Sequence, residues 1–120
     1  CMAIARHKPS DFLLISGDDL LTVPLYAIGG AGVISVLANA YPRIFQRMTI
    51  AAAHGDYRKA QTEAFKLLDI NGPMYEEGNP TGIKFLLSLM GICEPHTRLP
   101  VVPPSPALQA KIKMLYRSIK

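Results

Sequence analysis

Two short apolar runs, residues 12–15 and 33–36, stand out along the chain, and each is followed by small or polar residues. Between them lies one helix-length segment, residues 19–28, which ends at a run of glycines. Short apolar runs separated by a single amphipathic segment are typical of parallel strands that are buried on both faces. The pattern therefore predicts a β-α-β unit with strands at 12–16 and 33–36, and such folds place their chemistry just after each strand.

Helical spacing and turn residues predict helices over most of the remaining chain. Pro42 and Pro106 suit the first turn of a helix, and Asp56 suits the position that caps one. A proline-rich stretch, residues 94–104, is predicted to be irregular. The predicted helices span residues 2–7, 42–53, 57–69, 81–90 and 107–119.

This order of elements predicts two β-α units within residues 1–55 and an all-helical region within residues 56–120. Two such units do not form a stable parallel sheet, because each strand would expose an unpaired edge and two apolar faces. A (β/α)₈ barrel needs roughly 250 residues, about twice the 120 of this chain. We therefore predict an α/β fold that is the C-terminal part of a (β/α)₈ TIM barrel, followed by a helical appendage.

Composition narrows the possible functions. The chain has a formal net charge of +4, and much of the excess lies at Lys111, Lys113, Arg117 and Lys120. Such cations complement the end of a final helix, and without a nucleic-acid-binding motif we expect no nucleic-acid partner. The apolar runs are far shorter than the roughly 20 residues that span a membrane. With two cysteines and no recognisable signal peptide, the sequence favours the cytoplasm.

The residues after both predicted strands, and several in the helical region, resemble the dihydrodipicolinate synthase family. The resemblance runs in order through nearly the whole chain. It rests on Ser16-Gly17-Asp18-Asp19, Gly32-Val33-Ile34-Ser35-Val36, Ala38-Asn39, Glu77-Gly78-Asn79-Pro80 with Ile83-Lys84, and Arg98-Leu99-Pro100.

The resemblance implies a lyase of lysine and diaminopimelate biosynthesis that condenses pyruvate with L-aspartate 4-semialdehyde. In this family a lysine on the sixth strand forms a Schiff base with pyruvate, which requires an amine that burial keeps partly deprotonated. No cofactor is implied. The family commonly forms tetramers, so a homo-oligomer is expected.

By this resemblance the Schiff-base lysine, the proton-relay residues and the substrate-binding arginine all lie upstream of Cys1. The lysines Lys8, Lys59, Lys66 and Lys84 occupy a turn or helices, so none is expected to replace the missing one. Tyr41 likewise does not match the family's relay tyrosine. We therefore expect the chain to contain no catalytic residue, to represent a truncated enzyme and to be inactive alone.

Two positions of the substrate pocket can be carried over from the family. Ile34 matches the residue on the eighth strand whose backbone carbonyl lines the pyruvate pocket, although its side chain is also expected in the barrel core. Gly17 matches a position at the mouth of the seventh strand, where missing bulk admits substrate, but it equally suits a tight turn. Asp18 and Asp19 suit helix capping better than contact with substrate.

Other candidate sites are weaker. Cys93 and His96 have the spacing of a metal-ligand pair, but no second pair accompanies them, so no metal is expected. His7 and His54 are expected at helix ends. Two alternatives remain open: another pyruvate-dependent aldolase or lyase of the same superfamily, or a non-catalytic scaffold that retains part of the barrel.

Overall fold

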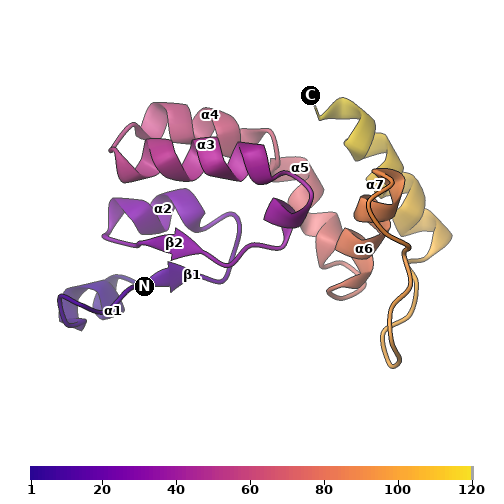
Figure 1. Cartoon of the computed structure of the whole chain (residues 1–120), viewed down its shortest axis with the longest axis horizontal. Helices are drawn as coiled ribbons and strands as arrows, with labels where there is room; N and C mark the ends of the chain where they lie inside the picture. The colour runs from indigo at the N-terminus through magenta and orange to yellow at the C-terminus, as the bar shows by residue number, and fades with distance from the viewer. Residues whose placement is uncertain (120) are drawn as a thin grey trace.

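The computed structural model describes residues 1–119 and shows a short parallel sheet overlaid by helices, with a helical cluster at one end (Figure 1). The N-terminal elements are α1 (Met2–His7), β1 (Ile15–Ser16), α2 (Thr22–Ala27), β2 (Gly32–Val33) and the 3₁₀ turn η1 (Leu37–Asn39). These are followed by α3 (Pro42–Ala53), α4 (Tyr57–Phe65), α5 (Leu68–Asn71), the 3₁₀ turn η2 (Gly72–Met74), α6 (Thr81–Leu89) and α7 (Pro106–Ser118).

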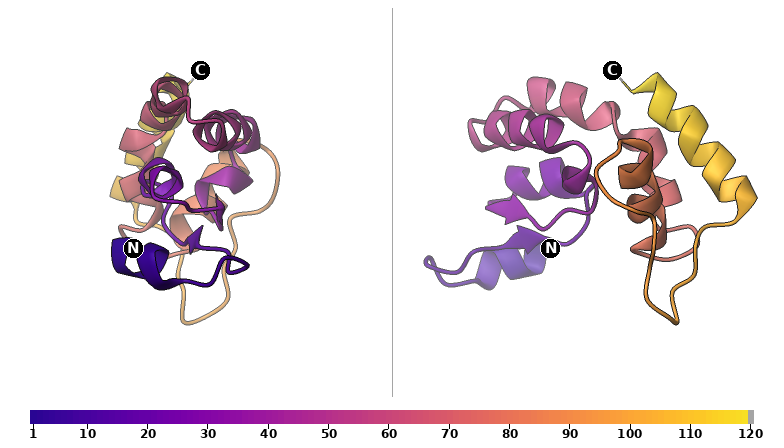
Figure 2. Two further views of the ribbon diagram at one scale, coloured as in Figure 1. Left: turned by 90° about the vertical axis from the view of Figure 1, so that its left-hand side faces the viewer. Right: turned by 45° about the vertical axis from the view of Figure 1, so that its right-hand side comes forward.

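The two strands are parallel and pair Ile15 with Gly32 and Ser16 with Val33. Helix α2 connects them and lies over the sheet, and α3 and α4 lie side by side above α2 (Figure 1). The carboxyl ends of both strands point toward the side of the molecule that carries α6 and α7 (Figures 1 and 2). The predicted β-α-β unit is therefore present.

The strands are shorter than predicted: Phe12 and Ile34, among others, lie outside the ladder of two residues per strand. In the described part of the chain each strand pairs with one other strand. That pairing covers two residues of each strand rather than the full apolar run. Several apolar side chains of these segments are exposed instead. They are Phe12, Leu13, Ile15 and Ile34.

All helices with a predicted start, except α2, begin within one residue of it, and the largest difference at a helix end is that of α4. Asp56 caps α4 by accepting a hydrogen bond from the Lys59 backbone at 3.0 Å, and Ser105 caps α7 in the same way through Leu108 at 3.2 Å. The predicted single helix over 57–69 is wrong, because the chain leaves the helix at Lys66 and begins α5 at Leu68. Lys120, one of the cations predicted to complement the end of the final helix, lies outside the described residues.

The apolar core runs from η1 to α7 and so contains residues on both sides of position 55. The boundary that the sequence places there, between the partial barrel and the helical region, stays a prediction. Gly82 is needed where α6 meets η2, since an added side-chain carbon would lie 2.6 Å from the Pro73 carbonyl oxygen. None of the helices in the described chain is long and apolar enough to cross a membrane. The largest fully buried apolar side chains are Leu37, Met48, Ile70, Met74, Leu86, Leu108 and Ile112.

A charged cluster links α3 to α4. Glu63, on α4, is nearly buried, and its carboxylate accepts a hydrogen bond from the Arg47 guanidinium at 3.0 Å and from the Lys66 ammonium at 2.6 Å. Burial alone would raise the pKa of Glu63. The hydrogen bonds and positive charges of Lys66 and Arg47 outweigh burial and lower that pKa.

Candidate functional site

The turn after β1 is closed by its own polar side chains. The Ser16 hydroxyl donates to the Asp18 carbonyl at 2.7 Å, and Asp18 Oδ1 accepts hydrogen bonds from the backbone N–H groups of Leu20 at 2.8 Å and Leu21 at 3.3 Å. Helix α2 begins at Thr22, three residues later than predicted, because this turn occupies residues 18–21. Asp18 therefore caps the turn that leads into α2 rather than the helix itself.

Unlike Asp18, which is exposed, Asp19 is only 6 % exposed. Its Oδ2 accepts a hydrogen bond of 2.9 Å from the backbone N–H of Leu37, eighteen residues further along the chain. This single side chain therefore joins the turn after β1 to the turn after β2. Helix capping, which was expected for Asp19, is not the contact its carboxylate makes.

Ile34 immediately follows β2, and its N–H donates to the Ser16 carbonyl at 2.9 Å. Its side chain is 77 % exposed, so it is not a core side chain within the described residues. Its carbonyl accepts no hydrogen bond from any residue in 1–119, which leaves that oxygen available to a partner outside the chain. The role of this carbonyl in binding pyruvate stays a prediction.

Gly17 lies beside Ile34 at the same end of the sheet. A side-chain carbon added at Gly17 would meet no atom within 4 Å, and its φ is not in the left-handed region. Neither crowding within the described residues nor backbone conformation therefore requires glycine here. This observation weakens the tight-turn interpretation and leaves open space next to the Ile34 backbone.

Two tyrosines near these turns have raised pKa values. Burial, followed by the negative charges of Asp19 and Asp18, raises the pKa of Tyr75. Burial and the neighbouring Tyr116 raise the pKa of Tyr41 to about 12. No pattern in the sequence indicated that Tyr75, 56 positions after Asp19, lies close to the Asp19 carboxylate.

The remaining candidates lie away from the strand ends. Lys8 donates to the Phe12 carbonyl at 2.9 Å, Lys59 and Lys66 lie in or next to α4, and Lys84 lies on α6. His7 and His54 lie at the ends of α1 and α3, as predicted, where each ring contacts a carbonyl one turn earlier. Residues 1–119 contain no group of three side chains able to hold a metal ion, and Cys93 and His96 lie in the loop before α7.

The sequence model of the Dihydrodipicolinate synthetase family matches residues 1–118. The 4-hydroxy-tetrahydrodipicolinate synthase of Cytophaga hutchinsonii is 45 % identical over 118 residues, which are 98 % of this chain and 40 % of the relative. The chain thus spans about 40 % of the length of this curated relative.

Solved structures agree with the sequence match. The crystal structure of dihydrodipicolinate synthase from Aquifex aeolicus superposes with a TM-score of 0.93 at 34 % identity, over 97 % of this chain and 40 % of that one. The chloride-inhibited dihydrodipicolinate synthase of Acinetobacter baumannii, complexed with pyruvate, gives 0.93 at 25 % identity, over 98 % and 40 %. The fold is the predicted C-terminal part of a TIM barrel with its helical appendage. On the match over residues 1–118 and these relatives, the chain belongs to the dihydrodipicolinate synthetase family.

Proposed function

We propose that this chain supplies the last two β-α units and the C-terminal helices of a 4-hydroxy-tetrahydrodipicolinate synthase. The complete enzyme would condense pyruvate with L-aspartate 4-semialdehyde, as a lyase of lysine and diaminopimelate biosynthesis. The observation that carries the proposal is the 45 % identity to one such synthase over 98 % of the chain. The alternative aldolases of the same superfamily would differ in residues upstream of Cys1.

Ile34 and Gly17 are the residues of this chain that we place at the pyruvate pocket. The free Ile34 carbonyl would accept a hydrogen bond at the pocket wall, and the open space at Gly17 would admit substrate or the Schiff-base lysine. The Schiff base itself would form on a lysine from the sixth strand, outside this chain. Burial of that lysine would keep part of its amine deprotonated, as nucleophilic attack on pyruvate requires.

The chain alone should have no synthase activity. None of Lys8, Lys59, Lys66 and Lys84 lies at the carboxyl end of a strand, and Lys66 is engaged by Glu63. The complete enzyme should be a cytoplasmic homo-oligomer, an inference that rests on the family resemblance.

A chimera tests this proposal. The upstream part of the Cytophaga hutchinsonii synthase, up to the start of the match, would be joined to residues 1–120. After incubation with pyruvate and borohydride, mass spectrometry should find a reduced adduct on the upstream lysine, and the chimera should consume L-aspartate 4-semialdehyde. The isolated chain should give neither result.

Gly17→Leu in the chimera fills the open space and should strongly reduce adduct formation. The matched control is Gly72→Leu, at the exposed start of η2, where φ is −53° and an added side-chain carbon would likewise meet no atom within 4 Å. It should leave adduct formation by the folded protein unchanged. An adduct on a lysine of residues 1–120, or a folded chimera without any adduct, would contradict the proposal.

A further inference from the structure

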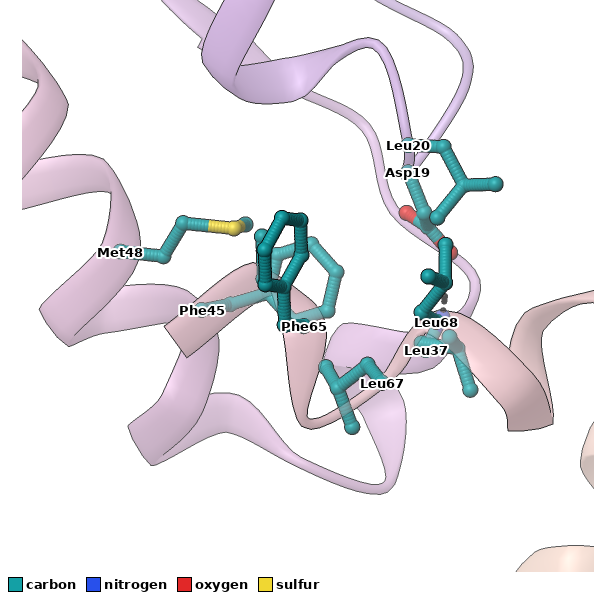
Figure 3. A pocket seen from close by; sticks show the side chains of 9 residues that line it. Asp19, Leu20, Leu37, Phe45, Met48, Phe65, Leu67 and Leu68 are labelled. Atoms are coloured by element: carbon teal, nitrogen blue, oxygen red, sulfur yellow. Dashed lines mark hydrogen bonds between the residues drawn. The ribbon is translucent and has the colours of Figure 1, made fainter. Parts of the chain in front are cut away.

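Two surface pockets of the molecule differ in their chemistry. The pocket of about 90 Å³ between the turn after β1 and helices α3, α4 and α5 is lined by apolar side chains around Asp19 (Figure 3). The Asp19 carboxylate is buried and accepts the Leu37 N–H, so this pocket presents no charged group that would select a ligand. The second pocket, of about 370 Å³, lies between the start of α6 and the loop that leads to α7. Its lining residues are Pro80, Lys84, His96, Thr97, Arg98 and Val101.

This second pocket gathers cationic side chains and has no carboxylate in its lining. Lys84 comes from α6, whereas His96 and Arg98 come from the loop. None of these three side chains makes a salt bridge or a hydrogen bond within residues 1–119. Lys84 is half-buried and the other two are exposed, so a ligand in the pocket can reach all three. The pocket therefore offers N–H donors and positive charge that no acceptor within the described chain uses.

Hydrogen bonds hold the loop in place against the helix. The Thr81 hydroxyl, at the start of α6, donates to the Val102 carbonyl at 3.0 Å. The Thr97 hydroxyl donates to the Val101 carbonyl at 2.9 Å, and the Val101 N–H donates to the Arg98 carbonyl at 3.0 Å. These contacts close the turn that carries Arg98, so its backbone is fixed beside α6 before any ligand binds. Such preorganisation lowers the entropy cost of binding.

The donors suit a phosphate group better than a carboxylate. They reach the pocket from a helix and from a loop, and a phosphate monoester presents three terminal oxygens with roughly two negative charges at neutral pH. Lysine and arginine both form charge-assisted hydrogen bonds with phosphate. Pro80 and Lys84 also lie at the first turn of α6, where the helix macrodipole adds positive potential. A volume of about 370 Å³ falls within the roughly 300–1,000 Å³ of small-molecule sites, which leaves room for the group that carries the phosphate.

We propose that this pocket binds a small phosphate monoester through Lys84, Arg98 and His96. Lys84 and Arg98 supply the positive charge, and the His96 ring, which carries an N–H in either protonation state, donates a third hydrogen bond. The pocket shares no residue with the turns after β1 and β2. The proposal therefore does not depend on the catalytic activity of the complete enzyme.

Isothermal titration calorimetry of the intact protein tests this site with methyl phosphate and with succinate, which has a similar charge at neutral pH. Methyl phosphate should bind about fivefold more tightly, because its oxygens meet at one phosphorus whereas succinate divides its charge between two ends. Lys84→Gln and Arg98→Gln should each weaken the binding of methyl phosphate about tenfold, since each removes a charge-assisted hydrogen bond. Lys59→Gln, at an exposed position on α4, removes the same charge and should leave the affinity unchanged.

Chemical acetylation locates the site without a substitution. Saturating methyl phosphate should slow the acetylation of Lys84 by acetic anhydride, measured by mass spectrometry, and should leave that of Lys59 unchanged. Because Arg98 is exposed, Arg98→Gln keeps the test valid if Lys84→Gln fails to fold. The proposal would be overturned by no saturable binding of methyl phosphate, by succinate binding as tightly, by parental affinity in a folded pocket variant, or by unchanged acetylation of Lys84.

Discussion

Asp18 and Asp19 are adjacent carboxylates with different surroundings. Asp18 is exposed and bonds to backbone N–H groups two and three residues ahead, whereas Asp19 is buried and bonds to a backbone N–H group eighteen residues ahead. The first contact is local, so the sequence indicated it, apart from the exact start of the helix. The second depends on how the two β-α units pack together, and no local pattern encodes that contact.

Glu63 gives a pH-dependent prediction at the same scale. Its pKa is lowered in the folded protein, so its contribution to stability is present above the unfolded pKa and is lost as the pH falls through the folded pKa. Glu63→Gln should lower the free energy of unfolding by about 1 kcal/mol at neutral pH, since both cationic partners are partly exposed to solvent. Urea unfolding at neutral and acid pH measures the difference.

The difference between the parent protein and Glu63→Gln should shrink as the solution is acidified. Glu94→Gln, at an exposed position, should change the stability little at either pH. A destabilisation by Glu63→Gln that is as large in acid as at neutral pH would show that the ion pairs are not its cause.

At the scale of elements, capping and apolar spacing predicted most helices, because those signals are local. Helix α3 has the predicted bounds, and α7 differs from them by one residue at each end. The break at Lys66 was missed because the apolar spacing continues through Leu67 into α5, although the backbone leaves the helix there. The strand lengths were missed because a ladder depends on partners, which apolar runs alone do not specify.

The segment of residues 92–105 is held by side chains from other elements. Glu77 Oε2 accepts a hydrogen bond from the Ser105 backbone at 2.7 Å, Glu77 Oε1 accepts one from the Ser105 hydroxyl, and Thr81 donates to the Val102 carbonyl at 3.0 Å. The hydrogen bonds from Ser105 lower the pKa of Glu77. These contacts fix the start of α7, and the loop before it, against the loop between η2 and α6 and the first residue of α6.

Replacing Glu77 should therefore loosen this segment. In Glu77→Gln a single amide oxygen replaces two carboxylate oxygens, and proteinase K should cleave within residues 92–105 faster than in the parent. Mass spectrometry of the fragments locates the cuts, and Glu94→Gln, which alters a charge in the same segment, should cleave at the parental rate.

At the scale of the whole molecule, the two ends of the chain differ in how well they bury apolar side chains. The core gathers residues from η1 to α7, while the two strands and the residues next to them expose the side chains of Phe12, Leu13, Ile15 and Ile34. The sequence predicted this imbalance, because two strands do not bury both of their faces. Other strands of the barrel would cover these residues in a complete enzyme.

The isolated chain should therefore associate through its strands. Light scattering should show aggregates of residues 1–120, and Ile15→Lys should reduce them by placing a charge on the exposed strand. Met114→Lys, an equally polar change at a 64 % exposed position on α7, should have little effect. A monodisperse parent chain would instead favour the scaffold interpretation.

The composition of the core also bears on protein synthesis. Leu37, directly after β2, belongs to the same buried cluster as Leu108 and Ile112 of α7, the last helix along the chain. The residues of α7 that complete the packing behind β2 are therefore translated well after β2 itself. Closure of a complete barrel would then wait until α7 had left the ribosome, and until that moment a chaperone could bind the open sheet.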